Sequence, residues 1–169
     1  MGTGSIVLVL GGARSGKSEL AEARAEELAA GGGVTYLATG WVPDGSDPQW
    51  AARVAAHRLR RPTGWSTVEV GDDLPGALRA AQGVVLVDSL GTWVSGASRF
   101  SVHTGSLLDA LRGRDAASVL VSDEVGLGVH PETALGVAFR DALGDLNRAM
   151  ATAADEVLLV VAGRTVKLA

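Results

Sequence analysis

The sequence predicts an α/β fold in which helices cover both faces of a mainly parallel β-sheet. The 169 residues match the size of one ordinary domain, so residues 1–169 are expected to form a single unit. Hydrophobic residues make up 47% of the chain and aromatic residues only 4%, which is typical of buried parallel strands rich in Val, Leu and Ala. Strand-like and helix-like segments also alternate along the chain, as this class requires.

Six short apolar runs bounded by turn residues predict the β-strands. They cover residues 5–10, 34–38, 66–70, 84–88, 118–122 and 156–161. Helical patterns separate most of these runs, and such strand–helix–strand connections are expected to be right-handed crossovers. The strands should therefore lie mostly parallel in one sheet.

Start and stop signals predict the connecting helices. The first should begin near Lys17 and end at the glycines 31–33. The second follows Asp47, a typical capping residue, and has Pro48 at its first position. The stretch from Gly91 to Gly105 is rich in Gly, Ser and Thr without clear periodicity, so it is expected to form an ordered or mobile loop. The other helices are predicted over residues 74–81, 107–111 and about 133–153.

Charge, cysteine content and hydropathy exclude several classes of protein. The net charge of −4 provides no general basic field for a polyanion, so no nucleic-acid partner is expected. The absence of cysteine excludes disulfides and thiolate zinc sites, and it fits a cytoplasmic location. No apolar stretch approaches the length of a membrane span.

The segment GGARSGKS fits the phosphate-loop pattern G-x-x-x-x-G-K-S and stands between a predicted strand and a predicted helix. This context predicts a P-loop NTPase-like (RecA-like) fold. The glycines let backbone N–H groups point at phosphate oxygens, while the helix adds its positive N-terminal dipole. Lys17 would neutralise the β- and γ-phosphates, and Ser18 would offer its hydroxyl to Mg²⁺. The predicted nucleotide-binding residues of the loop are Gly11, Gly12, Ala13, Arg14, Ser15, Gly16, Lys17 and Ser18.

A carboxylate at the end of another buried strand completes a typical phosphate-loop site. Asp88 ends the run VVLVD and would hold the metal, directly or through its water shell. The alternative is that Asp88 caps the segment that follows. The nearby phosphate loop favours the metal role.

A basic cluster ends the second predicted helix. His57, Arg58, Arg60 and Arg61 follow Arg53, and like charges on adjacent turns are unfavourable unless something anionic lies opposite. A triphosphate would serve as that anion. Taken alone, the cluster is better interpreted as a solvated helix end, where the dipole favours cations.

Seven segments in order carry a resemblance to a known family: GGARSGKS, YLATG, AARVAAHRLRRPTGWSTVE, VLVDSLGTWV, SDEVGLGVHPE, FRDALGDLN and AADEVLLVVAG. Together they resemble the bifunctional adenosylcobinamide kinase and adenosylcobinamide-phosphate guanylyltransferase of cobalamin biosynthesis. The resemblance covers nearly the whole chain. The phosphate loop occurs in many families, whereas the histidine segment and SDEVGLGVHPE are far more specific.

The resemblance implies two reactions. In the first, ATP or GTP donates its γ-phosphoryl group to the aminopropanol hydroxyl of adenosylcobinamide, and Lys17, Ser18 and Asp88 stabilise the transferring charge with Mg²⁺. In the second, His57 attacks the α-phosphorus of GTP and expels pyrophosphate. The guanylylated histidine then passes GMP to the phosphorylated corrinoid.

The resemblance also extends the predicted site and implies an assembly. Guanidinium groups would neutralise the triphosphate or the leaving pyrophosphate, and a turn and a glutamate would lie near the nucleotide. The family's relatives are oligomers, with trimers described, so a homo-oligomer is expected. The added nucleotide-binding residues are Thr39, Gly40, Arg58, Arg60, Arg61 and Glu69.

Two carboxylates end a further predicted strand, and the sequence leaves their role undecided between the active site and capping of the strand end. Asp123 and Glu124 would face the same crevice as Asp88. Many relatives have Asn at the position of Asp123, so Glu124 is the better candidate. The segment Ser89-Leu90-Gly91-Thr92 also departs from the Cys-Leu-Thr of many relatives.

Three other functions compete with this interpretation. A small-metabolite kinase would need only the phosphate loop and Asp88, and would leave His57 without a covalent role. A non-catalytic GTP-binding switch should carry an Asn-Lys-x-Asp motif, but the only asparagine, Asn147, precedes Arg148. A nucleic-acid ATPase would need a basic surface that the acidic balance does not favour.

Overall fold

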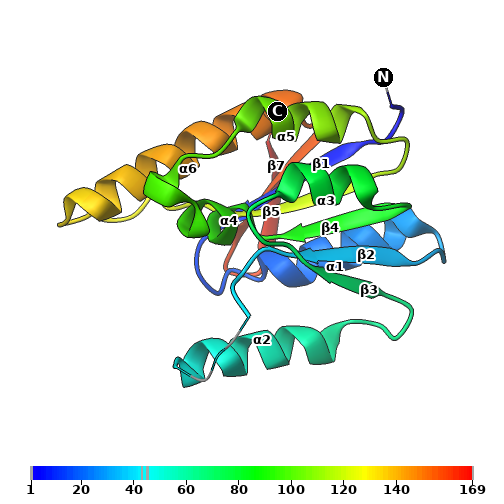
Figure 1. Ribbon diagram of the computed structural model, residues 1–169, viewed down its shortest axis with the longest axis horizontal. Helices are drawn as coiled ribbons and strands as arrows, with labels where there is room; N and C mark the ends of the chain where they lie inside the picture. Colours follow the sequence, from blue (N-terminus) through cyan, green and yellow to red (C-terminus); the bar gives the residue numbers. More distant parts are fainter. Residues whose placement is uncertain (1, 43, 45, 169) are drawn as a thin grey trace.

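The computed structural model describes residues 2–42, 44 and 46–168, except the side chains of Trp50, Arg53 and Arg60. In this part of the chain the strands form one seven-stranded sheet with the order β3-β2-β4-β5-β1-β6-β7 (Figure 1). All neighbouring strands are parallel except β6 and β7. The predicted mainly parallel α/β fold is confirmed. The strands are β1 (Ile6–Gly11), β2 (Val34–Ala38), β3 (Ser66–Glu69), β4 (Val84–Asp88), β5 (Ser118–Asp123), β6 (Glu156–Val161) and β7 (Arg164–Leu168).

The last strand, β7, was not predicted from the sequence. It pairs antiparallel with β6 through a turn in which Ala162 and Gly163 both have positive φ. Two such residues form the mirror-image turns that join hairpin strands tightly. The strand is short and exposed along its whole length, so it lacks the apolar pattern that marked the others.

The helices agree with the predicted positions except for one region. They are α1 (Lys17–Ala29), α2 (Pro48–Arg60), α3 (Leu74–Ala80), α4 (Leu90–Gly96), α5 (Thr104–Arg112) and α6 (Ala134–Ala153), with a 3₁₀ turn over Ser98–Phe100. At the start of α2, the Asp47 side chain accepts a hydrogen bond from the Gln49 N–H at 2.9 Å, as its capping role requires. Among the described residues, none of the helices is long and apolar enough to cross a membrane.

The loop prediction for Gly91 to Gly105 is wrong. This segment contains most of α4, the 3₁₀ turn and the start of α5. A capping box begins α4: the Ser89 side chain accepts from the Thr92 N–H, and the Thr92 side chain accepts from the Ser89 N–H. Trp93 and Val94 then anchor the short helix in the core. A helix of seven residues is too short to display a helical period in the sequence.

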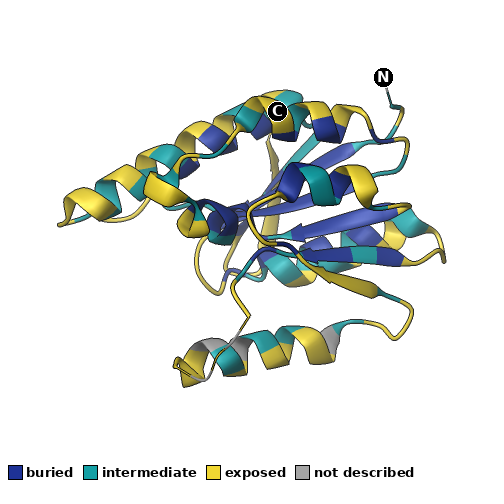
Figure 2. Ribbon diagram, viewed as in Figure 1, coloured by how far each residue is buried: buried dark blue, intermediate teal, exposed yellow. Residues whose placement is uncertain are grey.

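Two apolar cores lie on opposite faces of the sheet. The smaller one joins α1, through Ala21 and Ala25, to side chains of the central strands. The larger one joins the other face to α3, α4, α5 and α6. Figure 2 shows the central strands buried between these layers. The predicted covering of both faces by helices is confirmed.

Helix α2 lies apart from both layers, beyond the edge strand β3 (Figure 1). Its residues are mostly exposed or partly buried, as Figure 2 shows. Polar side chains of its last turns, described below, join it to the sheet. These contacts make α2 one wall of the candidate site.

Arg114 is a buried cation that holds the end of α3. Its guanidinium donates hydrogen bonds to the carbonyl oxygens of Leu78, Ala81 and Gly83, and to the Ser118 hydroxyl at 3.2 Å. Burial lowers the pKa of this guanidinium, so its charge depends on these acceptors. The cation also opposes the negative end of the helix dipole.

Replacing Arg114 by methionine should therefore lower the free energy of unfolding by about 2–4 kcal/mol, because three carbonyl groups lose their donor. Urea denaturation would measure the change. The matched variant Arg112→Met removes an exposed arginine from the end of α5 and should change stability by no more than about 0.5 kcal/mol. Equal losses in the two variants would contradict the role given to Arg114.

Candidate active site

The phosphate loop leaves β1 at Gly11 and enters α1 at Lys17. Gly16 has φ 94°, a conformation that favours glycine, and immediately precedes the first helical residue. The hairpin between β6 and β7 supports the loop, because the Gly163 N–H donates to the Ser15 carbonyl oxygen at 2.9 Å. The first N–H groups of α1 have no partners within the helix and can face an anion. The predicted loop geometry is thus present.

Lys17 lies at the end of this loop, as the first residue of α1, and is almost fully buried. Its Nζ is 2.8 Å from Oδ1 of Asp123 and donates to the Gly12 carbonyl oxygen at 3.3 Å. Asp123 ends β5, and the register of the parallel strands places it opposite Gly11. Glu124, the carboxylate favoured from the sequence, instead accepts a hydrogen bond from the Gly126 N–H within its own loop. Asp123 is therefore the carboxylate that the fold brings to the lysine.

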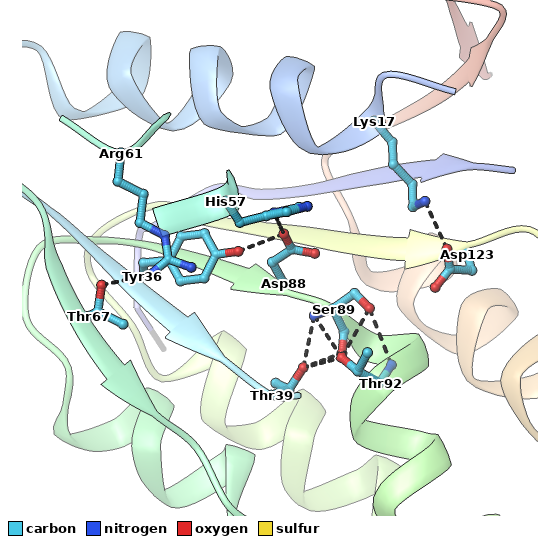
Figure 3. Close-up of polar contacts among 10 residues, drawn as sticks. All are labelled: Lys17, Tyr36, Thr39, His57, Arg61, Thr67, Asp88, Ser89, Thr92 and Asp123. Carbon is cyan, nitrogen blue, oxygen red and sulfur yellow. Dashed lines mark hydrogen bonds and ion pairs between the residues drawn. The ribbon is translucent and has the colours of Figure 1, made fainter. Parts of the chain in front are cut away.

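Asp88 lies at the end of β4 and is shared by two other side chains (Figure 3). The Tyr36 hydroxyl donates to Oδ2 of Asp88 at 2.6 Å, and Nδ1 of His57 is 3.3 Å from the same oxygen. Tyr36 reaches Asp88 because β2 and β4 are parallel neighbours and Ala38, two residues beyond Tyr36 on the same face, pairs with Asp88. Ser89, and not Asp88, caps the next helix, α4.

The contacts of Asp88 determine its charge. Burial raises the pKa of its carboxyl, but the hydrogen bonds from His57 and Tyr36 and the charges of His57 and Lys17 outweigh burial and hold the pKa below its usual value. The pKa of the Tyr36 hydroxyl is raised by burial and by the charge and hydrogen bond of Asp88, against an opposing effect of Arg61. Near neutral pH, Asp88 is thus an ionised acceptor and Tyr36 a protonated donor.

The last turns of α2 direct a row of side chains at the sheet. Val54 and His57 are three residues apart on α2 and share one helix face, and Arg61 follows directly after the helix. The Arg61 guanidinium lies 3.4 Å from the centroid of the Tyr36 ring, in a cation–π contact, and donates to the Thr67 hydroxyl at 2.9 Å. The histidine that the sequence singled out is thereby held against Asp88.

A second ion pair joins α2 to the edge of the sheet. Arg58 donates to Oε1 of Glu69 at 2.8 Å, and both side chains are partly exposed. Such an exposed pair contributes little to stability. Its position matters more, since it holds two of the predicted nucleotide-binding residues together.

The side chain of Thr39 makes several hydrogen bonds within the protein. Its hydroxyl contacts the Ser89 backbone at 2.6 and 2.8 Å and the Thr92 hydroxyl at 2.6 Å. The threonine cluster ties the end of β2 to the start of α4 (Figure 3). Thr92 thus has a contact of its own, although the residues around it depart from the common family pattern.

Two adjoining cavities contain most of the predicted site residues. A cleft of about 1080 Å³ is lined by the phosphate loop, α1 and α2, and a smaller cavity of about 200 Å³ lies against β2, β4 and β5. Both are lined by Lys17, Ser18, Trp41 and His57. The other predicted residues along the smaller cavity are Ala13, Gly40, Arg58, Arg61, Glu69 and Asp88, and those along the larger cleft are Arg14, Ser15 and Gly16.

Of the predicted residues whose side chains the structure describes, three are not among the cavity linings. Gly11 is buried at the end of β1, and Gly12 contributes its carbonyl oxygen to Lys17. Thr39 is buried against Ser89. The side chain of Arg60 lies outside the described residues.

Sequence reasoning missed two residues of the site. Strand alternation places Tyr36 on the same face as Ala38, but its contact with Asp88 depends on β2 lying beside β4, which no local pattern indicates. Trp41 follows the Thr39-Gly40 turn, is 55% exposed and lines both cavities. Tryptophan is common in cores, so its type alone did not indicate a site.

The oxygen donors of the site fit Mg²⁺ shared with a nucleotide. Within the described part of the chain, no three His, Asp or Glu side chains could enclose a metal by themselves. The Ser18 hydroxyl and the carboxylates of Asp88 and Asp123 line one cavity. Mg²⁺ is commonly bound by one or two protein oxygens together with substrate phosphates and waters.

Gly91 is required by the close approach of α4 to this site. A methyl group there would collide with the carboxylate of Asp123, the partner of Lys17. Gly91→Ala should therefore displace Asp123 and weaken the Lys17 contact. By contrast, Gly96 at the other end of α4 has no atom within 4 Å of such a methyl group.

The two glycines form a matched pair of variants. Gly96→Ala should be neutral or stabilise the protein by up to about 1 kcal/mol, because alanine favours helix, whereas Gly91→Ala should destabilise it by about 1–3 kcal/mol through overpacking. Thermal unfolding and nucleotide binding of both variants would be compared. A stabilised Gly91→Ala protein that binds nucleotide normally would contradict this packing argument.

Together, the parallel sheet, the phosphate loop and the strand-end carboxylates define a P-loop nucleotide-binding protein. The model of the family described as cobinamide kinase / cobinamide phosphate guanyltransferase matches residues 7–168. The chain belongs to this family.

Two relatives agree with this assignment over most of their length. The bifunctional adenosylcobalamin biosynthesis protein CobP of Pseudomonas aeruginosa is 39% identical over 165 residues, which cover 92% of this chain and 92% of the relative. The bifunctional adenosylcobalamin biosynthesis protein CobU of Escherichia coli is 36% identical over 185 residues, with 96% and 99% covered. Both matches extend over more than nine tenths of this chain rather than the phosphate loop alone.

A solved structure with little sequence similarity shows the same fold. The flagellar accessory protein FlaH from Methanocaldococcus jannaschii superposes with a TM-score of 0.55 at 17% sequence identity, covering 98% of this chain and 76% of FlaH. At this identity the match concerns the arrangement of strands and helices only.

Proposed function

We propose that this chain phosphorylates the aminopropanol hydroxyl of adenosylcobinamide and then transfers GMP from GTP to the product. Residues 1–169 would act as one P-loop kinase and guanylyltransferase domain. One observation carries the proposal: Lys17 of the phosphate loop and His57 of α2 line the same cavities. A kinase alone would need the lysine but would give the histidine no reaction.

In the kinase step, the phosphate loop binds the β- and γ-phosphates of ATP or GTP through its backbone N–H groups. Lys17 neutralises the charge that spreads over the transferring γ-phosphoryl group. Ser18 and Asp88 would hold Mg²⁺, which would supply further charge neutralisation and orient the phosphates. The acceptor hydroxyl forms its bond to the γ-phosphorus as the bond to the β-phosphate oxygen breaks.

In the transferase step, an imidazole nitrogen of His57 attacks the α-phosphorus of GTP, and pyrophosphate leaves. Arg58 and Arg61, with Arg60, would neutralise the triphosphate and the leaving pyrophosphate. A phosphate oxygen of adenosylcobinamide phosphate then attacks the phosphorus, and the electron pair of the broken P–N bond returns to the imidazole. One difficult displacement is thereby divided into two.

The remaining residues would serve binding. Glu69 and the turn of Thr39 and Gly40 would adjoin the nucleotide, and the loop residues from Gly11 to Ser18 would cradle its phosphates. The corrinoid is the second substrate in this proposal. A cytoplasmic location and a homo-oligomeric, trimeric assembly stay predictions.

The proposal is tested by following the corrinoid products. The protein would be incubated with adenosylcobinamide, GTP and Mg²⁺, and the mixture separated by chromatography. Adenosylcobinamide phosphate followed by adenosylcobinamide-GDP and pyrophosphate is expected. Accumulation of adenosylcobinamide phosphate without any GMP transfer would show that the protein is a kinase only. This result would contradict the second half of the proposal.

A further inference from the structure

The contact between His57 and Asp88 involves one particular ring nitrogen. Nδ1 of His57 is 3.3 Å from Oδ2 of Asp88, and in Figure 3 the other ring nitrogen points toward the part of the view where Lys17 lies. Both side chains are largely buried. An ionised carboxylate can only accept a hydrogen bond, so a neutral imidazole facing it carries its proton on Nδ1.

A proton on Nδ1 decides which nitrogen can react. In this tautomer the lone pair in the ring plane belongs to Nε2, and only a nitrogen with that lone pair can attack phosphorus. A carboxylate that orients a histidine and selects its tautomer is a recurring device in enzymes. Here the selecting group is a residue that the sequence pointed to for metal binding.

We infer that Asp88 fixes the Nδ1–H tautomer of His57, so that Nε2 is the nucleophile, and that Tyr36 is a positioning residue which holds the Asp88 carboxylate in place. This inference rests on the proposed guanylyl transfer. It gives Asp88 a second task in the site. Because both contacts use Oδ2, the other oxygen of the carboxylate can serve the water shell of the metal.

The arrangement also balances charge during the transfer. Nε2 forms a bond to the α-phosphorus, and the bond from that phosphorus to the oxygen bridging the β-phosphate breaks with its electron pair on pyrophosphate. The imidazole keeps its Nδ1 proton and so becomes cationic beside the Asp88 carboxylate. When GMP moves to the acceptor phosphate, the P–N electron pair returns to Nε2 and the ring is neutral again.

Tyr36 is built to hold this carboxylate. It is 2% exposed, its hydroxyl donates to Oδ2 at 2.6 Å, and Arg61 covers its ring at 3.4 Å. Strand β2 is the neighbour of β4 in the sheet, so the donor stands on a rigid element. A short hydrogen bond from such an element restricts the rotation of the acceptor.

The tautomer of His57 can be determined directly by NMR of the protein with ¹⁵N-labelled histidines. The chain has three histidines, and comparison with His57→Ala assigns the signals of His57. At a pH where the ring is neutral, we expect protonated Nδ1 and unprotonated Nε2. A neutral His57 that carries its proton mainly on Nε2 would overturn the inference, whether or not the protein is active.

The positioning role is tested by Tyr36→Phe, which removes one oxygen from a buried ring. The rate of His57 guanylylation in a single turnover should fall by roughly 10- to 100-fold, with the affinity for GTP changed far less, and the tautomer should become mixed. Thr35→Val is the matched control: it removes a hydroxyl from the adjacent residue of β2, whose partner is Ser66 at 3.1 Å, and should alter neither readout.

The possible outcomes separate this inference from the proposed function. Wild-type protein that forms no guanylylated histidine would contradict the proposed transfer, while its NMR spectrum would still report the tautomer. Labelling that proceeds normally in Tyr36→Phe, with His57 still protonated on Nδ1, would overturn the role of Tyr36. A slower reaction and a mixed tautomer in Tyr36→Phe, with neither in Thr35→Val, would support both parts.

Discussion

Replacing His57 by alanine is expected to abolish the labelling of the protein by GTP that carries a label on its α-phosphate. The wild-type label should be acid-labile and base-stable, as a phosphoramidate is. Without the imidazole no covalent intermediate can form, so GMP transfer to adenosylcobinamide phosphate should fall by at least about 10⁴-fold. Phosphorylation of adenosylcobinamide needs no bond to His57 and should persist.

The chain supplies two controls for this variant. His103 and His130 are exposed, and neither lines the cavities described above. His130 lies in the loop after β5 and contacts Arg140 of α6. His103→Ala and His130→Ala should both retain the label. Undiminished labelling of His57→Ala would show that another group is the nucleophile.

Replacing Lys17 by alanine is expected to remove the kinase activity. Its buried ammonium group lies in the phosphate loop, and among the described side chains no nearby cation can replace it at the same position: Arg14 is exposed, and Arg58 and Arg61 are held by partners on the sheet. Loss of one such charge-stabilising group typically lowers the rate about 10²–10³-fold. The loss of rate in Lys17→Ala should be at least as large, because this lysine is buried and binds phosphate. Steady-state phosphorylation of adenosylcobinamide would measure it.

The matched control is Lys167→Ala, which removes an exposed lysine that pairs with Glu156 on the outer hairpin. It should keep full kinase activity. Circular dichroism and thermal unfolding would verify that Lys17→Ala is folded, since Asp123 loses its partner in that variant. A folded Lys17→Ala protein with normal kinase activity would mean that the loop is not the catalytic phosphate site.

The alternation of elements predicted most of this fold. Strands β2, β4 and β6 have the predicted bounds, and the two ends of the phosphate loop fall where the pattern placed them. Such buried strands carry a continuous apolar signal. β7 carries none because it is exposed, and α4 is held by hydroxyl caps and by Trp93 rather than by a repeating apolar face.

The candidate site was predictable where chemistry follows local spacing. The loop, Asp88 and the histidine segment each have a pattern in the chain, and the fold brings them to one pair of cavities. Contacts that depend on sheet order had no such pattern. That Lys17 meets Asp123 follows from β5 being the neighbour of β1, and that Tyr36 meets Asp88 follows from β2 being the neighbour of β4.

Strand order also explains how one loop can serve two reactions. The strands of the phosphate loop and of Asp88 are separated by β5, so Lys17 pairs with Asp123 while Asp88 is left to His57 and Tyr36. One triphosphate in this site would meet the lysine near its γ-phosphate. The histidine, entering from α2, would meet its α-phosphate.

The most direct measurement is to map the covalent adduct after incubation with α-labelled GTP and Mg²⁺. The protein would be digested under alkaline conditions and the modified peptide identified by mass spectrometry. The proposed mechanism predicts GMP on the imidazole of His57, with no label on Lys17. Label on Lys17, or on any peptide that lacks His57, would contradict it.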